Sequence, residues 1–175
     1  MDIHSHLLDR NLQPNDYYVY YDDEVACFLL FNLSGQVVGY HQYRPFASKS
    51  FNNNPKDSRY FTLCKDKIGV WGLETYFYDP SVIFLTEGIF DACRLHNFHL
   101  PAIAVLANNP KQLRPWLSTL PKQIIAICDG DKAGRMLANS ADHAIMLEDG
   151  TDLGDLESVQ IQRIIEPWLR PQKWK

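Results

Sequence analysis

The chain of 175 residues has no long hydrophobic run, no closely spaced pair of cysteines and no excess of positive charge. No apolar run approaches the roughly 20 residues that cross a bilayer. The first six residues (Met1–His6) begin acidic and lack the basic, then apolar, plan of a signal peptide. We therefore expect a cytoplasmic protein with no membrane partner.

The cysteine pattern excludes a zinc ribbon, because the four cysteines are widely scattered: Cys27, Cys64, Cys93 and Cys128. Three of them lie inside apolar runs. We expect small core residues in a reducing compartment, rather than zinc ligands or disulfide partners.

The formal net charge of −4 argues against a protein that coats nucleic acid in general, but the charges are unevenly placed. Six basic residues lie between positions 40 and 68, where Asp57 and Asp66 are the only acids: Arg44, Lys49, Lys56, Arg59, Lys65 and Lys67. Acidic residues crowd the stretch from Asp129 to Asp155. A basic groove facing an acidic metal centre would give this asymmetry, whereas an ordinary solvated surface is the alternative for the basic residues.

The pattern of residues changes near Asp79–Pro80. Before it, short alternating stretches predict strands at 17–21, 26–33, 36–43, 59–63 and 68–71, with a turn at Ser34–Gly35 and a loop over 45–58. After it, predicted strands at 82–85, 102–106, 123–128 and 144–147 alternate with helices at 89–96, from about 110, at 132–140 and at 156–168. Repeated strand–helix units predict a parallel sheet with covering helices.

We therefore predict an α/β protein in which a small, mainly antiparallel β-rich subdomain (1–79) precedes the parallel sheet and its helices (80–170). Residues 171–175 form a basic tail.

Three short acidic motifs follow predicted buried strands: Thr86–Gly88, Asp129–Gly134 and Gly150–Asp155. In an open parallel sheet, the carboxyl ends of the strands share one edge, where ligands bind. Several carboxylates gather there at low cost only when a cation neutralises them. The arrangement predicts bound Mg²⁺ or Mn²⁺ and hence chemistry on phosphate esters, which points to nucleic acid.

Each motif also has a simpler interpretation. Glu87 either holds a metal or acts as a general base, or it complements the dipole of the following helix. Asp129 and Asp131 either turn toward one metal or form a turn followed by a helix cap. Asp152 is a candidate for coordinating metal or water, while Asp155 is better suited to cap the last helix.

Together, the Glu-Gly after one strand and the Asp-x-Asp about forty residues later resemble the TOPRIM domain of topoisomerases, bacterial-type primases and certain nucleases. Thr86–Ala92 is similar to the first TOPRIM motif of primases, and Asp129–Gly134 to the second. Gly35–Tyr40 and Val70–Leu73 resemble stretches of the primase catalytic core that precede that domain. Arg44 falls near the arginine that follows in that core, and Arg59–Phe61 resembles its Lys-Tyr-Leu segment.

The chain also departs from the primase pattern. Leu153 and Gly154 replace the Pro and second Asp of the third motif, and Ala107–Pro110 replaces a Gly-rich turn. We find neither the zinc-binding domain of primases nor a helicase extension. We therefore expect a compact catalytic core of the kind that a phage or mobile element encodes, working in the host cytoplasm in the phage case.

The resemblance implies metal-dependent synthesis of short RNA primers on single-stranded DNA from ribonucleoside triphosphates, with a separate helicase or zinc-binding replication protein as partner. Glu87, Asp129 and Asp131 would be catalytic, and Asp152 would join them in binding metal. The residues expected to bind nucleic acid or nucleotide are Arg44, Arg59, Lys65, Lys67 and Lys132. Aromatic residues interleaved with them offer stacking surfaces for bases: Tyr40, Tyr43, Phe46, Tyr60 and Phe61.

Two other functions remain open at this point. A TOPRIM nuclease would use the same acids to direct water against a phosphodiester. A non-catalytic nucleic-acid-binding module of a replication or recombination assembly would keep only a vestigial metal site.

Overall fold

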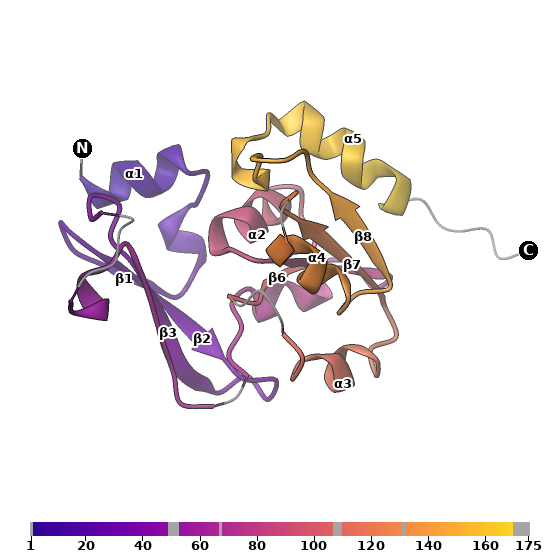
Figure 1. The fold of residues 1–175 in the computed structure, drawn as a ribbon, viewed down its shortest axis with the longest axis horizontal. Coiled ribbons are helices and arrows are strands. Elements are labelled where there is room, and N and C mark those ends of the chain that lie inside the picture. The colour runs from indigo at the N-terminus through magenta and orange to yellow at the C-terminus, as the bar shows by residue number, and fades with distance from the viewer. Residues whose placement is uncertain (1, 49–52, 67, 107–109, 131, 170–175) are drawn as a thin grey trace, which may run out of the picture. The chain divides into compact units, whose positions relative to one another are not determined.

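The computed structural model describes residues 2–48, 53–66, 68–106, 110–130 and 132–169. The chain divides into two compact units, Met1–Leu73 and Glu74–Lys175. Each unit contains one four-stranded sheet (Figure 1). The boundary that the sequence suggested, Asp79–Pro80, lies a few residues further on. The predicted basic tail at 171–175, and three residues of the turn Ala107–Pro110, lie outside the described residues.

The first unit is an antiparallel sheet in the strand order β1-β2-β3-β4. Its strands are β1 (Val19–Tyr21), β2 (Ala26–Phe31), β3 (Val37–Tyr43) and β4 (Tyr60–Cys64). Its helices are α1 (Ile3–Asp9) and the short 3-10 helices η1 (Pro14–Asp16) and η2 (Pro55–Asp57). The predicted strand at 68–71 is wrong, because this segment makes only isolated bridge pairing at Val70 and Trp71, with Val70 opposite Phe31.

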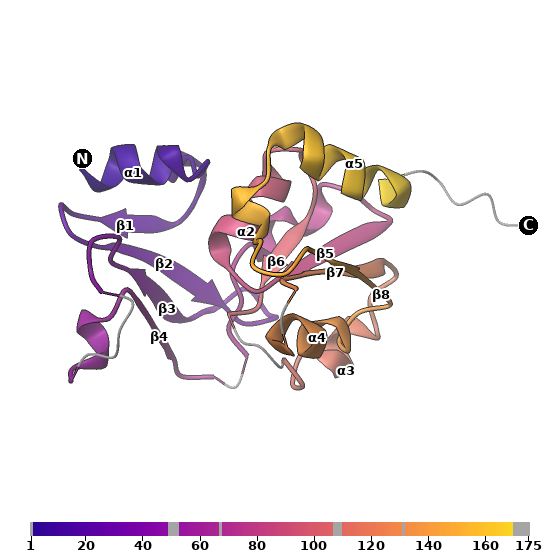
Figure 2. The same ribbon diagram turned by 45° about the horizontal axis from the view of Figure 1, so that its top comes forward.

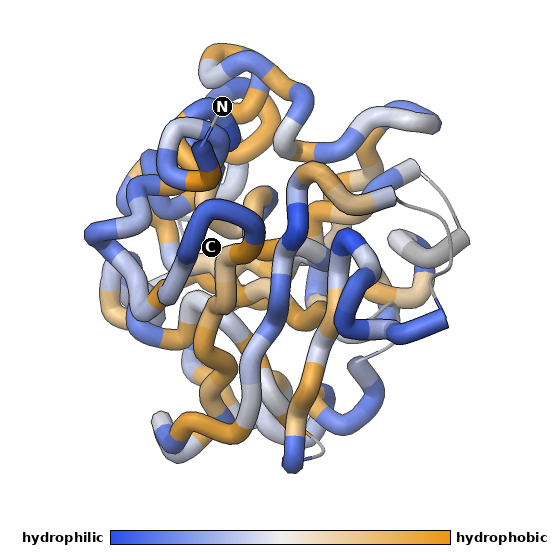
Figure 3. The backbone as a smooth tube through the Cα atoms, turned by 90° about the vertical axis from the view of Figure 1, so that its left-hand side faces the viewer, coloured by the Kyte–Doolittle hydropathy of each residue, from blue (hydrophilic) through white to orange (hydrophobic). Residues whose placement is uncertain are grey.

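Alternation along β2 builds the core of the first unit. Ala26, Phe28 and Leu30 are fully buried, whereas the residues between them are half-buried. The ring of Trp71 meets that of Phe28 edge-on at a centroid distance of 6.2 Å. In Figure 3, where this unit faces the viewer, short hydrophobic and hydrophilic stretches follow one another along its strands. A sheet with one covered face produces this pattern.

Helix α1 was not predicted from the sequence. Asp2 caps it, because its carboxylate accepts a hydrogen bond from the Ser5 backbone N–H at 2.8 Å. Ile3 and Leu7, four residues apart, are buried on one side of the helix. The N-terminal segment is therefore part of the core of its unit.

The second unit is a parallel sheet in the order β6-β5-β7-β8. Its strands are β5 (Val82–Thr86), β6 (Ala102–Ala104), β7 (Gln123–Cys128) and β8 (His143–Met146). Its α-helices are α2 (Ile89–His96), α3 (Arg114–Leu117), α4 (Lys132–Ala138) and α5 (Ser158–Leu169), and the 3-10 helices are η3 (Leu73–Phe77) and η4 (Leu153–Asp155). Figure 2 shows α2 and α5 on one side of the sheet and α3 and α4 on the other. The predicted fold class, an α/β parallel sheet preceded by an antiparallel unit, is confirmed.

The strand order creates a topological switch point. From β5 the chain moves outward to β6, and it then returns past β5 to β7 and continues to β8. The connections leaving β5 and β7 therefore go to opposite faces of the sheet, which makes the carboxyl ends of these two strands the switch point. Ligands of open α/β sheets bind at this position.

Burial accounts for the composition of the central strands. All five residues of β5 are buried, as are five of the six in β7, because helices cover both faces. Cys93 and Cys128 are buried, Cys27 and Cys64 are half-buried, and none of the four cysteines forms a disulfide. None of the described helices combines the length and the apolar character needed to span a bilayer.

A buried histidine makes the stability of the second unit depend on pH. Nε2 of His96 lies 3.0 Å from the Ala102 carbonyl oxygen, and burial lowers the pKa of His96 from 6.5 to about 4. Below pH 6.5, His96 is protonated in the unfolded chain, whereas in the folded chain it stays neutral until about pH 4. The free energy of unfolding should therefore fall by about 1.4 kcal/mol per pH unit over this window.

Urea unfolding of the wild type and of His96→Gln between pH 4 and pH 7 tests this expectation. The variant should show a shallower slope. Burial also lowers the pKa of His41 to about 4, so the slope should not vanish. The same substitution at the exposed His143 is the control, and equal slopes for wild type and His96→Gln would contradict the assignment.

Candidate metal and nucleic-acid site

Glu87 and Asp129 occupy the switch point. Glu87 follows β5 and Asp129 follows β7, and the two strands pair in parallel with Leu85 opposite Ala126. The Thr86 hydroxyl donates to the Gly88 carbonyl at 3.0 Å, which holds the turn between β5 and α2. The two acids predicted from the sequence are thus brought to neighbouring strand ends.

The negative charges of Glu87 and Asp129 both affect the thiol of Cys128, the last residue of β7. Its pKa is raised to about 12, first by burial and then by the negative charges of Glu87 and Asp129. Both carboxylates therefore lie close enough to one sulfur atom to act on it. One carboxylate oxygen of Glu87 is itself buried. Two negative charges converging at a partly buried edge form an environment that a cation would stabilise.

The glycines of the second motif allow close packing of this edge. A Cβ atom at Gly134 would lie 2.1 Å from the Asp129 carbonyl oxygen, so only glycine lets α4 pass this close. A Cβ atom at Gly130 would lie 2.8 Å from both the Cα and the N of Asp149. The loop after β8 therefore lies directly against the loop after β7.

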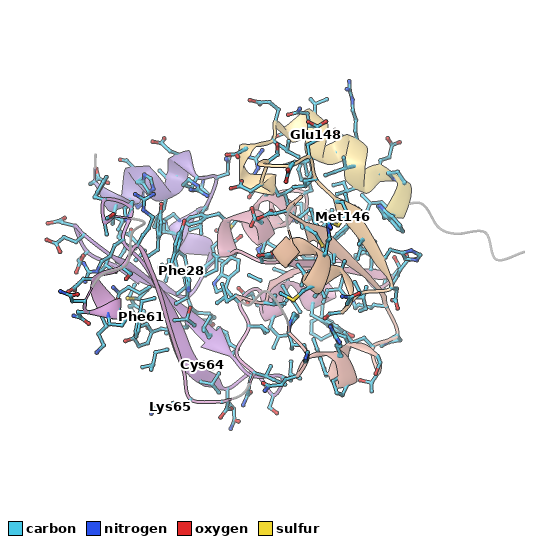
Figure 4. All side chains as sticks on the ribbon, viewed as in Figure 1. Phe28, Phe61, Cys64, Lys65, Met146 and Glu148 are labelled. Carbon is cyan, nitrogen blue, oxygen red and sulfur yellow. The ribbon has the colours of Figure 1, made fainter. Side chains whose placement is uncertain are left out.

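The third motif is shaped by Asp152. Its Oδ1 accepts a hydrogen bond from the Asp155 backbone N–H at 3.0 Å and so caps η4. The expectation that Asp155 caps the last helix is wrong, because Asp155 lies within η4 and α5 begins only at Ser158. Figure 4 labels Met146, the last residue of β8, and the exposed Glu148 just beyond it.

Asp131 lies outside the described residues, and of Lys132 the structure describes only that it begins α4. Within the described part of the chain, no group of three or more His, Cys, Asp or Glu side chains is arranged to hold a metal ion. The described donors, Glu87 and Asp129, still fit Mg²⁺, which commonly takes one or two protein carboxylates and completes its shell with water and phosphate.

The structure brings two of the predicted basic residues together. The Arg44 backbone N–H donates to the Arg59 carbonyl at 2.8 Å. The Arg44 side chain forms an ion pair with Glu24 at 3.3 Å, and Nε of Arg59 donates to the Ala47 carbonyl at 2.9 Å. Arg44 also lines a pocket of about 500 Å³ together with Phe46 and Asp57.

Lys65 lies apart from this pair. Arg59 directly precedes β4 and Lys65 directly follows it, so the strand separates them by roughly 20 Å. Figure 4 labels Lys65 at this far end of the strand. Lys67 lies outside the described residues. Among the described members of the predicted set, Arg44, Arg59 and Lys65 therefore do not form one compact cluster.

The predicted stacking residues divide between the two faces of the sheet. Tyr43 and Tyr60 are directly opposite in register, with ring centroids 5.2 Å apart, and Tyr43 is buried. Tyr40 and Phe61 share the other face, with centroids 6.2 Å apart. Phe46 lies beyond β3 and is 62% exposed.

Sequence reasoning missed His6 and Arg10, which α1 brings to the sheet. Nε2 of His6 lies 2.9 Å from the Tyr43 hydroxyl. Burial and the hydroxyl of Tyr60 raise the pKa of Tyr43, whereas the guanidinium groups of Arg10 and Arg59 act in the opposite direction. Arg10 therefore adds a second cation beside Arg59. The capping Asp2 and the spacing of Ile3 and Leu7 were the signals that could have revealed this helix.

The fold and the carboxylates of Glu87 and Asp129 define a class of protein. In this class, an antiparallel unit is followed by a parallel α/β unit with an acidic edge, that is, carboxylates at the switch point of its sheet. No protein-family model matches the chain. The DNA primase of Aquifex aeolicus is 32% identical to it over 114 residues, which cover 61% of this chain and 22% of that protein.

Solved structures of primases share the fold. The primase fragment of the bacteriophage T7 primase-helicase protein has a TM-score of 0.61 at 16% identity, covering 93% of this chain and 69% of that one. The zinc-binding and RNA polymerase domains of the Aquifex aeolicus primase have a TM-score of 0.59 at 21% identity, covering 94% and 46%. A DnaG catalytic domain bound to single-stranded DNA has a TM-score of 0.59 at 18% identity, covering 94% and 58%.

The chain therefore has the fold of the catalytic core of DNA primases, as the resemblance to primases predicted. It spans 22% of the curated relative and 46% to 69% of these solved chains.

Proposed function

We propose that this chain is a primase-type catalytic core that synthesises short RNA primers on single-stranded DNA. The observation that carries the proposal is the placement of Glu87 and Asp129 at neighbouring strand ends within a primase-core fold. The sequence similarity to a DNA primase supports it independently.

In the proposed reaction, the 3′-hydroxyl oxygen of the primer bonds to the α-phosphorus of a ribonucleoside triphosphate, and pyrophosphate leaves. Glu87, Asp129 and Asp131, with Asp152, would hold Mg²⁺ or Mn²⁺. When bound, the cation would neutralise the carboxylates and the phosphate oxygens of the nucleotide. Glu87 would also accept the proton of the attacking hydroxyl.

We assign template binding to the first unit. A DnaG catalytic domain of the same fold has been solved with single-stranded DNA. In this chain, Arg10, Arg44 and Arg59 supply positive charge and Phe46 an exposed ring at the same end of the sheet. Lys65, at the other end of β4, Lys132, at the start of α4, and Lys67 would contact nucleotide or more distant parts of the template. We also propose a helicase or a zinc-binding replication protein as a partner, because solved proteins of the same fold are joined to a zinc-binding domain or belong to a primase-helicase.

The test is incubation with single-stranded DNA, ribonucleotides and Mg²⁺ or Mn²⁺, followed by gel electrophoresis. Template-dependent oligoribonucleotides are the expected product. Shortened DNA without synthesis would replace the proposal with a nuclease. Binding of DNA with neither reaction, in the presence of a primase zinc domain added separately, would favour a non-catalytic module.

Arg59 gives a separate prediction for the template. Replacing Arg59 by alanine would remove one of the proposed phosphate contacts, so affinity for an oligothymidine should fall. The slope of log affinity against log salt should also become shallower by about one. Fluorescence anisotropy at several salt concentrations measures both quantities. Arg163→Ala, at an exposed arginine of α5, is the control. An unchanged slope for Arg59→Ala would remove this residue from the template surface.

A further inference from the structure

Helix α2 carries two side chains, one turn apart, that hold the segment following β8. Oδ1 of Asp91 accepts a hydrogen bond from the Gly154 backbone N–H at 3.2 Å. Nη2 of Arg94 donates to the Leu156 carbonyl oxygen at 2.5 Å. Gly154 lies within η4 and Leu156 directly follows it. The two bonds therefore attach both η4 and the residue after it to α2, which lies more than sixty residues earlier in the chain.

The buried guanidinium of Arg94 is poorly explained by stability alone. The residue is only 7% exposed, and no acceptor among the described residues reaches its buried Nε. A buried charge with so little compensation commonly costs stability, and an apolar side chain of similar volume is often at least as stable. What Arg94 does provide is one strong, directed contact with the backbone that follows η4.

Leu153 completes the attachment of this turn. It is 1% exposed and anchors η4 in the core of the second unit. It stands where the primase pattern has a proline, and Gly154 stands where that pattern has a second acid. This chain therefore holds the third motif by a buried leucine and by the two side chains of α2.

Helix α2 connects Glu87, which precedes it, to the turn that contains Asp152. Its capping residue Gly88 directly follows Glu87, and its side chains hold the turn that Asp152 caps. We propose that Arg94, assisted by Asp91, is a positioning residue that sets Asp152 relative to Glu87 for cation binding. The inference rests on the proposed function, because it assigns Asp152 to the same metal site.

The test compares Arg94→Met, Arg94→Lys and Asp91→Asn with the control Arg163→Met, at an exposed arginine of α5. Three quantities are measured: amide hydrogen exchange in the η4 segment, the affinity for Mn²⁺ without substrate, and primer synthesis as a function of Mg²⁺ concentration. Circular dichroism verifies the fold.

Arg94→Met should keep its thermal stability, because the apolar side chain fills the same space. Exchange at Gly154 and Asp155 should become at least about tenfold faster, and Mn²⁺ affinity about tenfold weaker, as is typical when residues that orient metal ligands are lost. Higher Mg²⁺ should restore synthesis, which it would not do for a damaged fold. Arg94→Lys should be less affected, because it keeps a charged donor. Asp91→Asn should resemble the wild type, since its amide oxygen still accepts the Gly154 N–H.

Wild-type exchange and Mn²⁺ affinity in a folded Arg94→Met protein would overturn the proposal. If that variant does not fold, Arg94→Lys decides on the same measurements. An Asp91→Asn protein that loses Mn²⁺ while its exchange is unchanged would overturn the positioning role of Asp91. If the wild type itself neither binds Mn²⁺ nor synthesises primers, the proposed function fails. The proposal for Asp152 then falls with it, and exchange in the η4 segment shows whether Arg94 holds that segment.

Discussion

Replacing Asp129 by asparagine is expected to lower the rate of primer synthesis by about 10³-fold, equivalent to about 4 kcal/mol of transition-state stabilisation. Asparagine keeps the size of the side chain and removes its charge. The site would then hold a cation with one carboxylate fewer at the end of β7, where Asp129 stands beside Glu87. Single-turnover synthesis at fixed template and Mg²⁺ measures the effect.

The thermal stability of the Asp129→Asn variant, unlike its activity, should not fall. In metal-free buffer, Asp129→Asn relieves repulsion from Glu87, so its melting temperature should equal or exceed that of the wild type. Glu148→Gln removes a charge from an exposed position just beyond β8 and is the matched control. Synthesis within a few-fold of wild type by Asp129→Asn would show that the acidic edge is not the reaction centre.

Replacing Gly134 by alanine is expected to destabilise the second unit by about 3 kcal/mol, although alanine is the better helix former by about 1 kcal/mol. The added Cβ would lie 2.1 Å from the Asp129 carbonyl oxygen and 3.0 Å from the Asp129 nitrogen. These are backbone atoms, so α4 and the strand end must move apart. The melting temperature should fall by about 15 °C, and primer synthesis should fall with it because Asp129 is displaced.

Gly35→Ala is the matched control for this prediction. Gly35 has a φ of +76° and nothing within 4 Å of an added Cβ, so the cost there is only that of a left-handed backbone, about 1 kcal/mol. Differential scanning calorimetry compares the two variants. A Gly134→Ala protein as stable as the wild type would mean that α4 does not pack this closely on the end of β7.

The strands and helices of the second unit could be read from the sequence with good accuracy. The predicted ranges of α2 and β7 match the structure, because strong apolar patterns with glycine or aspartate at their ends leave few alternatives. The predicted strand at 68–71 was wrong, because an apolar run of four residues does not reveal whether a neighbouring strand is available to pair with it. Helix α1 was missed because its pattern is short and its first turn is capped by a single aspartate.

The sequence by itself determined the identity of the acidic residues and their position after strands, since both depend on local patterns of a few residues. It also determined the parallel character of the second sheet, because strand–helix alternation leaves little choice. Only the tertiary structure decided that β5 and β7 are neighbours, which makes Glu87 and Asp129 partners. It also decided that Asp152 caps a turn held by Asp91 and Arg94, and that Arg10 lies near Arg59. The physical reason is that these contacts join residues far apart in the chain. They depend on strand order and helix packing, which local patterns of hydrophobicity do not specify.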